Sequence, residues 1–573
     1  MPTDLDMLIA EGIDAVVGEG KMFQLGTIEN RGEMMPFIAN APDSLPQYFA
    51  YFCSVQGEAT FIVDGDERLS FAETYALATK VAEALVSGWG IKKGDRVGIA
   101  MRNAPAWVIS YMAVLMAGGV ATLLNGWWQS GELAAGVRDV GCTLVLADEQ
   151  RAKRLGEPGA DHGATIASLN VALPIADAME PILTRGTGAT AGPVDLPAMA
   201  ADDIATILFT SGSTGTAKGA YSTHRAVLQG TFSYIVQTAS IVHVLTAMGN
   251  PPQGQASTLL NVPLFHVTGE VPVFLQSLAI GRKLVMMPKW DAEEAMRLIE
   301  KEGVTYFVGV PLMSYEMLIH PNRDKYDLSS CKTFAAGGAP RPRDHVRRLA
   351  TSMGGGMPVL GYGLTETNAI GCGNLNENYV AKPDSTGPAS LPLVDLAIID
   401  DAGRLLPQGE IGEVSIRSIA NFAAYWNNPQ ATADAFSADG RFRTGDLGYV
   451  DEDGYLFIVD RKKDIIIRGG ENVSCPEVEA AIYANEAVAE CSVFGLPDER
   501  FGEIVGAVIL FKSGEAIGEP ALRDFLNANL AAFKVPSVIW ITDAPLPILG
   551  TGKLDRVAIR DGYQARYAKD IGA

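Results

Sequence analysis

Cysteine is scarce in this chain of 573 residues, and its six cysteines lie far apart, with no C-x-x-C pair. The sequence therefore has neither the spacing of a zinc site nor the density of a disulfide-stapled domain. We expect the cysteines to be buried thiols in a reducing compartment.

Positive charge is also scarce. The chain has 45 lysines and arginines but 67 aspartates and glutamates, which gives a formal net charge of −22. Binding to DNA or RNA needs a concentrated basic surface, so a nucleic acid is excluded as the main partner. A nucleotide is not excluded, since a few local donors suffice to hold a phosphate.

A targeting segment is missing from the start of the sequence, where MPTDLDMLIAEG has no basic stretch followed by an apolar run. No signal peptide is predicted, and a cytoplasmic location is expected. The longest apolar stretch, 107–124, approaches the length of a membrane span, but Gly118 and Gly119 interrupt it. We interpret it as a core helix, a glycine stop and a core strand, with no transmembrane segment.

The length of the chain exceeds what one hydrophobic core organises, which indicates at least two domains. From about Leu69 helical and strand patterns alternate, which is typical of a largely parallel α/β sheet. From Val394 the pattern changes to antiparallel hairpins, with turns at 401–403 and 453–454. Beyond Asp464 a compact α+β segment is predicted. The sub-blocks expected before it are 44–183, 202–393 and 394–460.

One glycine- and hydroxyl-rich turn, FTSGSTGTAKG at 209–219, follows directly on the apolar run DDIATILF. Glycines let backbone N–H groups approach an anion, hydroxyls add donors, and the lysine adds a cation. The Walker A spacing does not fit, because Ala217 precedes the lysine and Gly219 follows it. A flexible linker is the alternative, but a linker has no reason to follow a buried strand. The predicted polyphosphate ligands are Thr210, Ser211, Gly212, Ser213, Thr214, Gly215 and Lys218.

This turn resembles the signature loop of the class I adenylate-forming enzymes, the superfamily of acyl-CoA synthetases, carrier-protein-loading adenylation domains and beetle luciferases. The usual proline before the lysine is replaced by Ala217. Further motifs resemble those of the family, in the family's order, from about Ser44 to Asp555. The resemblance implies an α/β fold with a large N-terminal domain of parallel and mixed sheets, residues 1–460, including a β-rich subdomain. A hinge at 461–464 and a small mobile α+β domain at 465–573 would follow.

Two motifs resemble the family's adenine and phosphate segments: GGAP at 337–340 and GYGLTET at 361–367. The resemblance implies that the ring of Tyr362 stacks on adenine, that Thr365 bonds a phosphate oxygen and that Glu366 holds magnesium. Without the resemblance, the second motif would be only an incomplete match to the dinucleotide-binding fingerprint. The nucleotide-binding residues expected here are Gly338, Ala339, Pro340, Gly361, Tyr362, Gly363, Thr365 and Glu366.

Three later charged positions are assigned a function only because of this resemblance. Asp446, in RTGD, matches the aspartate that accepts the ribose hydroxyls. In DRKKD at 460–464, Arg461 would contact the nucleotide and Lys463 would be the backbone pivot of the hinge. Lys553 matches the lysine that reaches the adenylation site. Taken singly, these residues would be interpreted as a turn, a solvated linker and a solubilising lysine.

The resemblance implies two reactions, with ATP, Mg²⁺ and coenzyme A as cofactors or substrates. A carboxylate attacks the α-phosphorus of ATP to give an acyl-adenylate and pyrophosphate, and the thiol of coenzyme A then displaces AMP. Thr214, Lys218, Glu366 and Lys553 are the expected catalytic residues, because they would neutralise charge around the phosphates. A rotation of the small domain would then bring a different segment to the thiol. That segment contains Gly469, Gly470 and Glu471.

The acyl pocket is the least specified part. His266, in PLFHVTG, matches a segment that gates the carboxylate's entrance, although a hydrogen-bonded structural role is the ordinary alternative and no metal-ligand spacing accompanies it. Gly309, Gly337 and Gly361 are expected to leave room in the pocket. Trp127 and Trp128 could be a pocket wall or a dimer contact.

The substrate expected is a medium- or long-chain fatty acid, with aryl, phenylpropanoid or steroid side-chain acids as alternatives. An enzyme that loads a carrier protein and a non-enzymatic relative are rival hypotheses, but no segment resembles a carrier domain and every required residue is present. A homodimer is possible.

Overall fold

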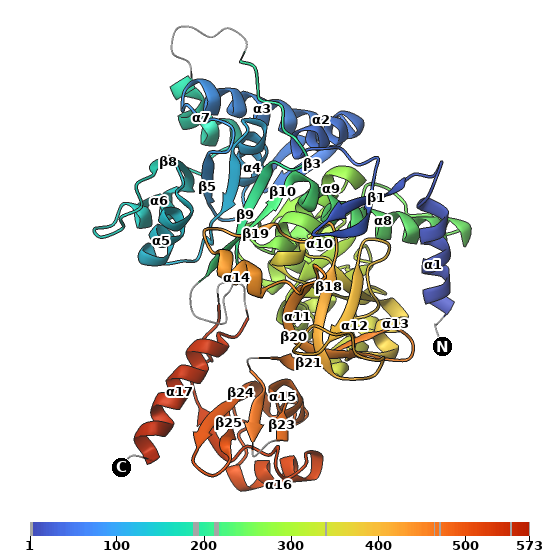
Figure 1. The fold of residues 1–573 in the computed structure, drawn as a ribbon, viewed down its shortest axis with the longest axis vertical. Helices are drawn as coiled ribbons and strands as arrows, with labels where there is room; N and C mark the ends of the chain where they lie inside the picture. Colours follow the sequence, from blue (N-terminus) through green and yellow to red (C-terminus); the bar gives the residue numbers. More distant parts are fainter. Residues whose placement is uncertain are drawn as a thin grey trace.

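The computed structural model describes residues 4–186, 194–210, 217–338, 341–462, 464–468, 471–549 and 553–571. Its mixed α/β architecture confirms the predicted fold class (Figure 1). The described residues form four sheets of four or more strands and a short N-terminal two-stranded hairpin.

The first large sheet has the order β19-β10-β9-β6-β5-β7-β8, with β5 to β9 parallel. Helices cover it, so β6 and β7 are buried at every residue, as expected for strands shielded on both faces. Its strands are β5 (Arg96–Ala100), β6 (Val120–Leu123), β7 (Leu144–Asp148), β8 (Thr165–Leu169), β9 (Ile204–Thr210), β10 (Lys218–Thr223) and β19 (Ala424–Tyr425).

The apolar stretch that approaches the length of a membrane span folds as helix α4 (Pro105–Met116), a glycine turn and β6. Every residue of α4 is buried, which explains why it is apolar on all sides. Gly118 ends the helix with a φ of 81°. None of the helices formed by the described residues is long and apolar enough to cross a membrane.

The second large sheet has the order β16-β15-β14-β13-β11-β12-β3-β4. It crosses the sub-block boundaries expected from the sequence, because β3 pairs in parallel with β12, some 220 residues later in the chain. Likewise β9 and β10, from the second expected sub-block, belong to the first sheet. Hydrophobic periodicity identifies strands but does not specify distant partners. The strands are β3 (Thr60–Asp64), β4 (Glu67–Ser70), β11 (Ser257–Leu260), β12 (Lys283–Met286), β13 (Tyr306–Gly309), β14 (Thr333–Gly337), β15 (Met357–Gly363) and β16 (Gly371–Leu375).

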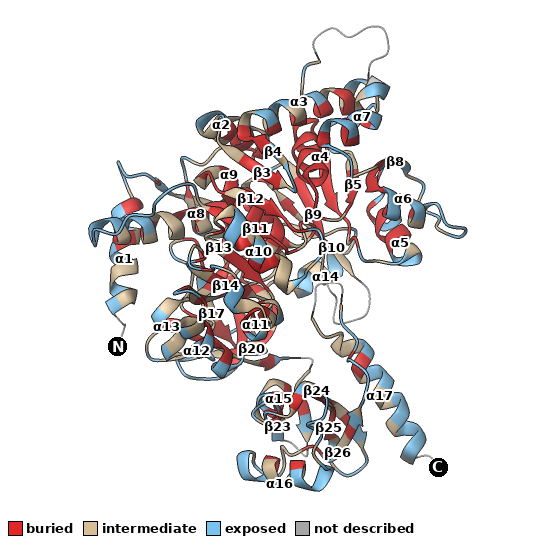
Figure 2. Ribbon diagram, turned by 180° about the vertical axis from the view of Figure 1, so that it is seen from behind, coloured by how far each residue is buried: buried red, intermediate tan, exposed pale blue. Residues whose placement is uncertain are grey.

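One hydrophobic core joins the two large sheets through α3 (Phe71–Ser87), α4, α8 (His224–Ala247) and the π-helix η1 (Gly269–Leu275) (Figure 2). Ser70 begins α3 with a capping box, since its hydroxyl accepts from the N–H of Glu73 while the Glu73 carboxylate accepts from the N–H of Ser70. The remaining helices of this region are α2 (Leu45–Gln56), α5 (Ser130–Val140), α6 (Glu149–Leu155), α7 (Ile175–Gly186), α9 (Gln276–Ile280), α10 (Ala292–Glu302), α11 (Pro311–Ile319), η2 (Arg323–Lys325), α12 (Arg343–Ser352), η3 (Thr365–Thr367), α13 (Asn376–Ala381) and α14 (Pro429–Asp434).

An antiparallel sheet has the order β17-β18-β20-β21, and turns form at 401–403 and 452–454, in agreement with the turns predicted from the sequence. Its strands are β17 (Asp395–Ile399), β18 (Gly412–Arg417), β20 (Phe442–Val450) and β21 (Leu456–Arg461). N-terminal elements that the sequence analysis left unassigned are α1 (Asp4–Val16) and the hairpin β1 (Leu25–Asn30) and β2 (Glu33–Ile38).

The C-terminal lobe has its own sheet and its own hydrophobic clusters. In Figure 1 it lies apart from the main body and is reached through the chain that follows β21. Its elements are β22 (Ile466–Arg468), β23 (Glu471–Val473), α15 (Cys475–Tyr483), β24 (Val488–Asp498), β25 (Gly502–Phe511), α16 (Glu519–Asn529), β26 (Val538–Thr542) and α17 (Arg556–Ile571).

Candidate active site

A cleft of about 4240 Å³ receives residues from both large sheets, the antiparallel block and the C-terminal lobe. Strands β9, β14 and β15 all end at this cleft. The carboxyl ends of parallel strands are where open α/β sheets place their ligand sites. Most of the described residues singled out from the sequence line it: Thr210, Lys218, His266, Gly337, Gly338, Gly361, Tyr362, Gly363, Thr365, Glu366, Asp446, Arg461 and Lys553.

Asp446 is held between two donors at the base of the cleft. The hydroxyl of Tyr362 donates to its Oδ2 at 2.7 Å, and Nε of Arg461 lies 3.0 Å from its Oδ1. The antiparallel register of β20 and β21 places Asp446 opposite Arg461, so local pairing builds this contact. Burial raises the pKa of Asp446, and the charge of Arg461 opposes that rise. The result is an enclosed carboxylate, a suitable acceptor for a pair of hydroxyls.

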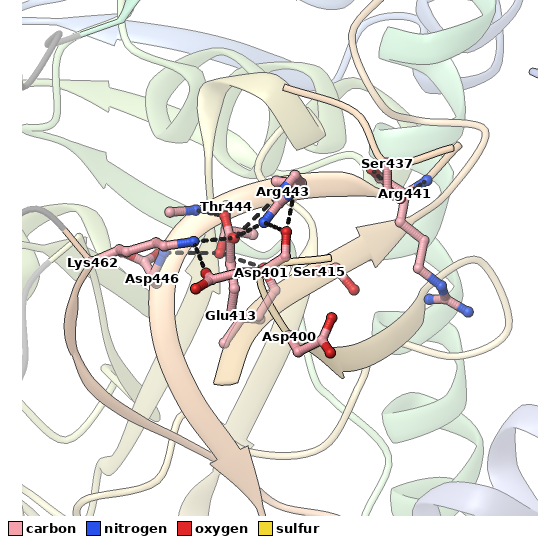
Figure 3. A network of polar contacts seen from close by, with 12 residues as sticks. Asp400, Asp401, Glu413, Ser415, Ser437, Arg441, Arg443, Thr444, Asp446 and Lys462 are labelled. Atoms are coloured by element: carbon pink, nitrogen blue, oxygen red, sulfur yellow. Dashed lines mark hydrogen bonds and ion pairs between the residues drawn. The ribbon is translucent and has the colours of Figure 1, made fainter. Parts of the chain in front are cut away.

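A polar network next to Asp446 fixes the part of β20 that carries it (Figure 3). Glu413 accepts from Arg443 at 2.7 Å and from the backbone N–H of Gly445 at 3.2 Å. Lys462 lies 3.2 Å from the same carboxylate and 2.6 Å from Asp401. The residue just before the expected pivot is therefore tied to the antiparallel block.

Glu366 and Lys218 meet at a residue that the sequence analysis missed. The hydroxyl of Tyr425 donates to Oε1 of Glu366 at 2.7 Å, and the ammonium of Lys218 lies 5.0 Å from the centre of the Tyr425 ring. Burial raises the pKa of Glu366, while the Tyr425 hydrogen bond is the strongest influence in the opposite direction. Tyr425 stands in β19, which pairs with β10, the strand that Lys218 begins. No local sequence pattern marks such a tertiary contact, so Tyr425 could not be identified from the sequence.

Glu366 fits the role of a magnesium ligand. Its Oε1 is engaged by Tyr425, and no hydrogen bond to Oε2 is found in the described part of the chain. A magnesium ion typically takes one or two protein carboxylates and completes its shell with phosphate oxygens and water. No cluster of three or more His, Cys, Asp or Glu able to hold a metal occurs in the ranges that the structure describes.

Lys553 reaches the cleft from the C-terminal lobe. Its ammonium lies against Gly338, whose φ is 74° and which has no side chain to obstruct it. Burial lowers the pKa of Lys553 to about 8, with a further decrease from the charge of Arg461. The pKa of His266 is lowered to about 3, by burial and then by the charge of Lys553. These two residues therefore lie close enough to influence one another, with His266 neutral.

His266 is positioned where the chain enters the π-helix η1. Its backbone oxygen accepts from the N–H groups of Gly269 and Glu270, at 2.8 and 3.0 Å. Its Nδ1 accepts from the N–H of Thr268 at 3.3 Å. The neutral ring then carries its proton on Nε2. His266 therefore forms a structural hydrogen bond and also lines the cleft.

The three glycines expected to open the acyl pocket differ in their surroundings. Among the described residues, a Cβ added to Gly361 would meet no atom within 4 Å, and one added to Gly337 would meet only the carbonyl oxygen of Gly361, at 3.5 Å. Gly309 is a correction: it does not line the cleft, because the space beside it is filled by Met313, with Sδ 2.9 Å from where a Cβ would lie.

The two adjacent tryptophans pack separately along the cleft. The Trp127 ring meets Phe265 edge-on at 4.8 Å, and the Trp128 ring meets Phe209 at 4.9 Å. Both line the cleft. Trp127 remains 41 % exposed.

Several expected residues lie outside the described part of the chain: Ser211, Gly212, Ser213, Thr214, Gly215, Ala339, Pro340, Lys463, Gly469 and Gly470. The ends of the first loop are described, and Lys218 pairs with Thr210 across β9 and β10. Glu471 is exposed in β23 and does not line the cleft.

Comparison with known proteins gives concordant matches. The family model described as AMP-binding enzyme matches residues 49–426, and the model for the AMP-binding enzyme C-terminal domain matches 477–553. The chain is 33 % identical to a long-chain-fatty-acid–CoA ligase, FadD13, of Mycobacterium tuberculosis, over 88 % of this chain and 95 % of the relative. It is equally similar, 33 % with the same coverage, to a feruloyl-CoA synthase of Amycolatopsis. The crystal structure of ATP-bound MatB from Rhodopseudomonas palustris superposes with a TM-score of 0.78 at 28 % identity, covering 91 % of this chain and 99 % of that one.

Proposed function

We propose that this chain, which belongs to the AMP-binding enzyme family and is an AMP-forming acid–thiol ligase, takes a medium- or long-chain fatty acid as its acid. We propose further that its thiol substrate is coenzyme A. The observation that carries the mechanism is the position of Lys553, which comes from the C-terminal lobe and lies against Gly338. This position supports the proposal, because a lysine of the C-terminal lobe lines the cleft.

In the adenylation step the carboxylate must approach ATP, so negative charges converge. Lys553 would lie between the carboxylate and the α-phosphate, while Lys218 would bind the outer phosphates. Asp446 would accept the ribose hydroxyls, and Arg461 would keep that carboxylate ionised and oriented. A magnesium ion on Glu366 would add positive charge beside the phosphates when bound.

The thioester step has a different requirement. Once the acyl-adenylate exists, the cleft needs a path for a long thiol and no longer needs Lys553. A rotation of the C-terminal lobe after Lys462, which is tied to the antiparallel block, would withdraw the lysine. The cytoplasm supplies both ATP and coenzyme A, and we propose it as the location.

A fatty acid is favoured by the lining between α8 and the second large sheet. Apolar side chains from both elements face the cleft there, among them Ile241, Val308, Ala335 and Val359. Gly361 leaves room beside this lining, since a Cβ added there would meet no atom of the described residues within 4 Å. An aryl acid is the second candidate, because the feruloyl-CoA synthase is as similar as the fatty-acid ligase.

The test is ATP–pyrophosphate exchange with a panel of saturated acids of increasing length and a set of cinnamic and benzoic acids, followed by product analysis with coenzyme A. We expect exchange to be strongest with medium- or long-chain acids and acyl-CoA to form with AMP release. Strongest exchange with the aromatic acids would overturn the proposed acid. Exchange without acyl-CoA formation would overturn the proposed acceptor.

A further inference from the structure

One part of the cleft has a floor made by three neighbouring strands of the second large sheet, β13, β14 and β15. Residues two apart on a strand point to the same face, and the register aligns them in rows across the sheet. The row next to Gly338 consists of Gly337 and Gly361. The two rows behind it, which also line the cleft, are Val308, Ala335 and Val359, and then Tyr306, Thr333 and Met357. From Gly337 back to Thr333 this floor extends for about 13 Å, at ~3.3 Å per residue.

Helix α8 lines the same cleft, and Tyr234 marks the part of it that is near the nucleotide site. The Tyr234 hydroxyl donates to the carbonyl oxygen of Ala369 at 2.6 Å. Ala369 in turn packs closely against the backbone of Gly363, the last residue of β15. This part of α8 therefore lies at the end of the floor where the strands deliver the nucleotide-binding residues.

Further along, α8 reaches the last row of the floor. The side-chain amide of Gln276 donates to the hydroxyl of Thr238, in α8, at 2.7 Å, and its oxygen accepts from Arg282 at 3.3 Å. The guanidinium carbon of Arg282 lies 5.0 Å from the centre of the Tyr306 ring. The carboxyl-terminal half of α8 is therefore at the end of the cleft away from the nucleotide, where Ile241 lines it.

Helix α1 packs against α8 at this far end (Figure 1). A Cβ added to Gly12 would lie 2.8 Å from the carbonyl oxygen of Ser240, so the two backbones are in direct contact there. Ile9 and Ile13 stand on the adjoining face of α1, three residues before Gly12 and one after it, and both line the cleft. Ile241 has the corresponding position on α8, one residue after Ser240. The two helices thus present an apolar corner to the cleft.

Contacts at both ends hold α1 in this position. Near its start the Asp6 carboxylate accepts from the hydroxyl of Tyr455 at 2.9 Å and from the side-chain amide of Asn378 at 2.8 Å. At its end the carbonyl of Val16 accepts from the N–H of Phe23 at 2.9 Å, and both side chains are buried in the main hydrophobic core. The helix lies outside the segments that the two family models match. It is therefore a firmly seated wall that precedes the shared part of the chain.

We infer that α1 closes the far end of the acyl channel, where Ile9 and Ile13 contact the methyl end of the bound chain and set the longest acid that the enzyme accepts. The charge of α1 suits an apolar chain end, because the helix has four acidic and no basic residues and would repel a second carboxylate. This inference rests on the proposed fatty-acid substrate. It assigns chain-length selectivity to two named residues.

The test measures ATP–pyrophosphate exchange by the full-length enzyme with butanoic, octanoic, dodecanoic and hexadecanoic acids. Ile13→Trp fills the far end of the channel, and the double variant Ile9→Ala with Ile13→Ala enlarges it. The matched controls are Leu8→Trp and Leu8→Ala, because Leu8 is half-buried in the same helix and does not line the cleft. The readout is the ratio of kcat/KM between long and short acids, since a loss of folded enzyme lowers the rate with every acid alike.

We expect Ile13→Trp to lower kcat/KM for the longest acid that the wild type accepts at least about 10-fold, because the added ring excludes the end of the chain. Butanoic acid should stay within about twofold of wild type. The double alanine variant should shift the preference toward longer acids, and both Leu8 variants should keep the wild-type ratio.

A wild-type ratio in the double alanine variant or in folded Ile13→Trp would overturn the inference, as would an equal change in the Leu8 controls. If Ile13→Trp does not fold, the double alanine variant alone decides. A wild-type enzyme that prefers aromatic acids to every saturated acid would instead refute the proposed substrate, and the inference with it.

Discussion

Tyr425 offers the sharpest test of how the phosphate end of the cleft is built. Replacing it by phenylalanine removes the hydroxyl that donates to Glu366 at 2.7 Å and keeps the ring beneath the Lys218 ammonium. A hydrogen bond to a charged group contributes about 1.5–3 kcal/mol. We therefore expect Tyr425→Phe to lower kcat/KM for adenylation about 10- to 100-fold, with a higher magnesium requirement.

The pH dependence makes this prediction specific. The Tyr425 hydroxyl stabilises the ionised form of Glu366 and so lowers its pKa, against a burial effect that raises it. Removing the hydroxyl raises the pKa of Glu366 further, by about one unit for each 1.36 kcal/mol lost. The acidic limb of the kcat/KM profile should therefore move to higher pH in Tyr425→Phe.

The assay is ATP–pyrophosphate exchange over pH 5 to 9 at several magnesium concentrations. Tyr449→Phe is the control, because Tyr449 stacks on Phe457 and no hydrogen bond of its hydroxyl occurs among the described residues. An acidic limb and a magnesium requirement that both match wild type in Tyr425→Phe would refute the reasoning.

Two further predictions concern Lys553 and its surroundings. With its pKa lowered to about 8, Lys553 loses its proton as the pH rises through that value, so kcat/KM for adenylation should fall above about pH 8, whereas thioester formation from supplied acyl-adenylate should lack this limb. A pH-independent exchange rate up to pH 10 would contradict it. Gly338→Ala places a methyl group where the Lys553 ammonium lies, at a φ of 74°, and should reduce exchange at least about tenfold while sparing the thioester step. Steady-state measurement of both half-reactions checks this, and an equal loss in both would count against it.

Local patterns predicted the elements of the fold well and their assembly less well. The turns expected at 401–403 and 453–454 form, and the second joins β20 to β21. The partnership of β3 with β12 was not predictable, because parallel pairing over such a sequence separation depends on tertiary packing. The π-helix η1, which begins at Gly269, three residues after His266, contains Pro272, and a proline inside a helical pattern ordinarily marks its end.

The candidate site shows the same limit. Asp446 and Arg461 were each predicted only from the family resemblance, and the pairing of β20 with β21 places them opposite one another. Tyr425 could not be predicted, because 59 residues separate it from Glu366 and only the β10–β19 pairing brings them together. Gly309 illustrates the converse error: a missing side chain was expected to leave space, and Met313 occupies it.

The most direct measurement of the central claim is the pair of half-reactions in Lys553→Ala. Loss of a preorganised charge from a developing transition state typically costs about 10²- to 10³-fold in rate. We expect exchange to fall by that factor while thioester formation from supplied acyl-adenylate stays within a few-fold of wild type. Lys569→Ala, at an exposed lysine of α17, should leave both unchanged. Equal loss of both half-reactions in Lys553→Ala, or loss of neither, would contradict the account.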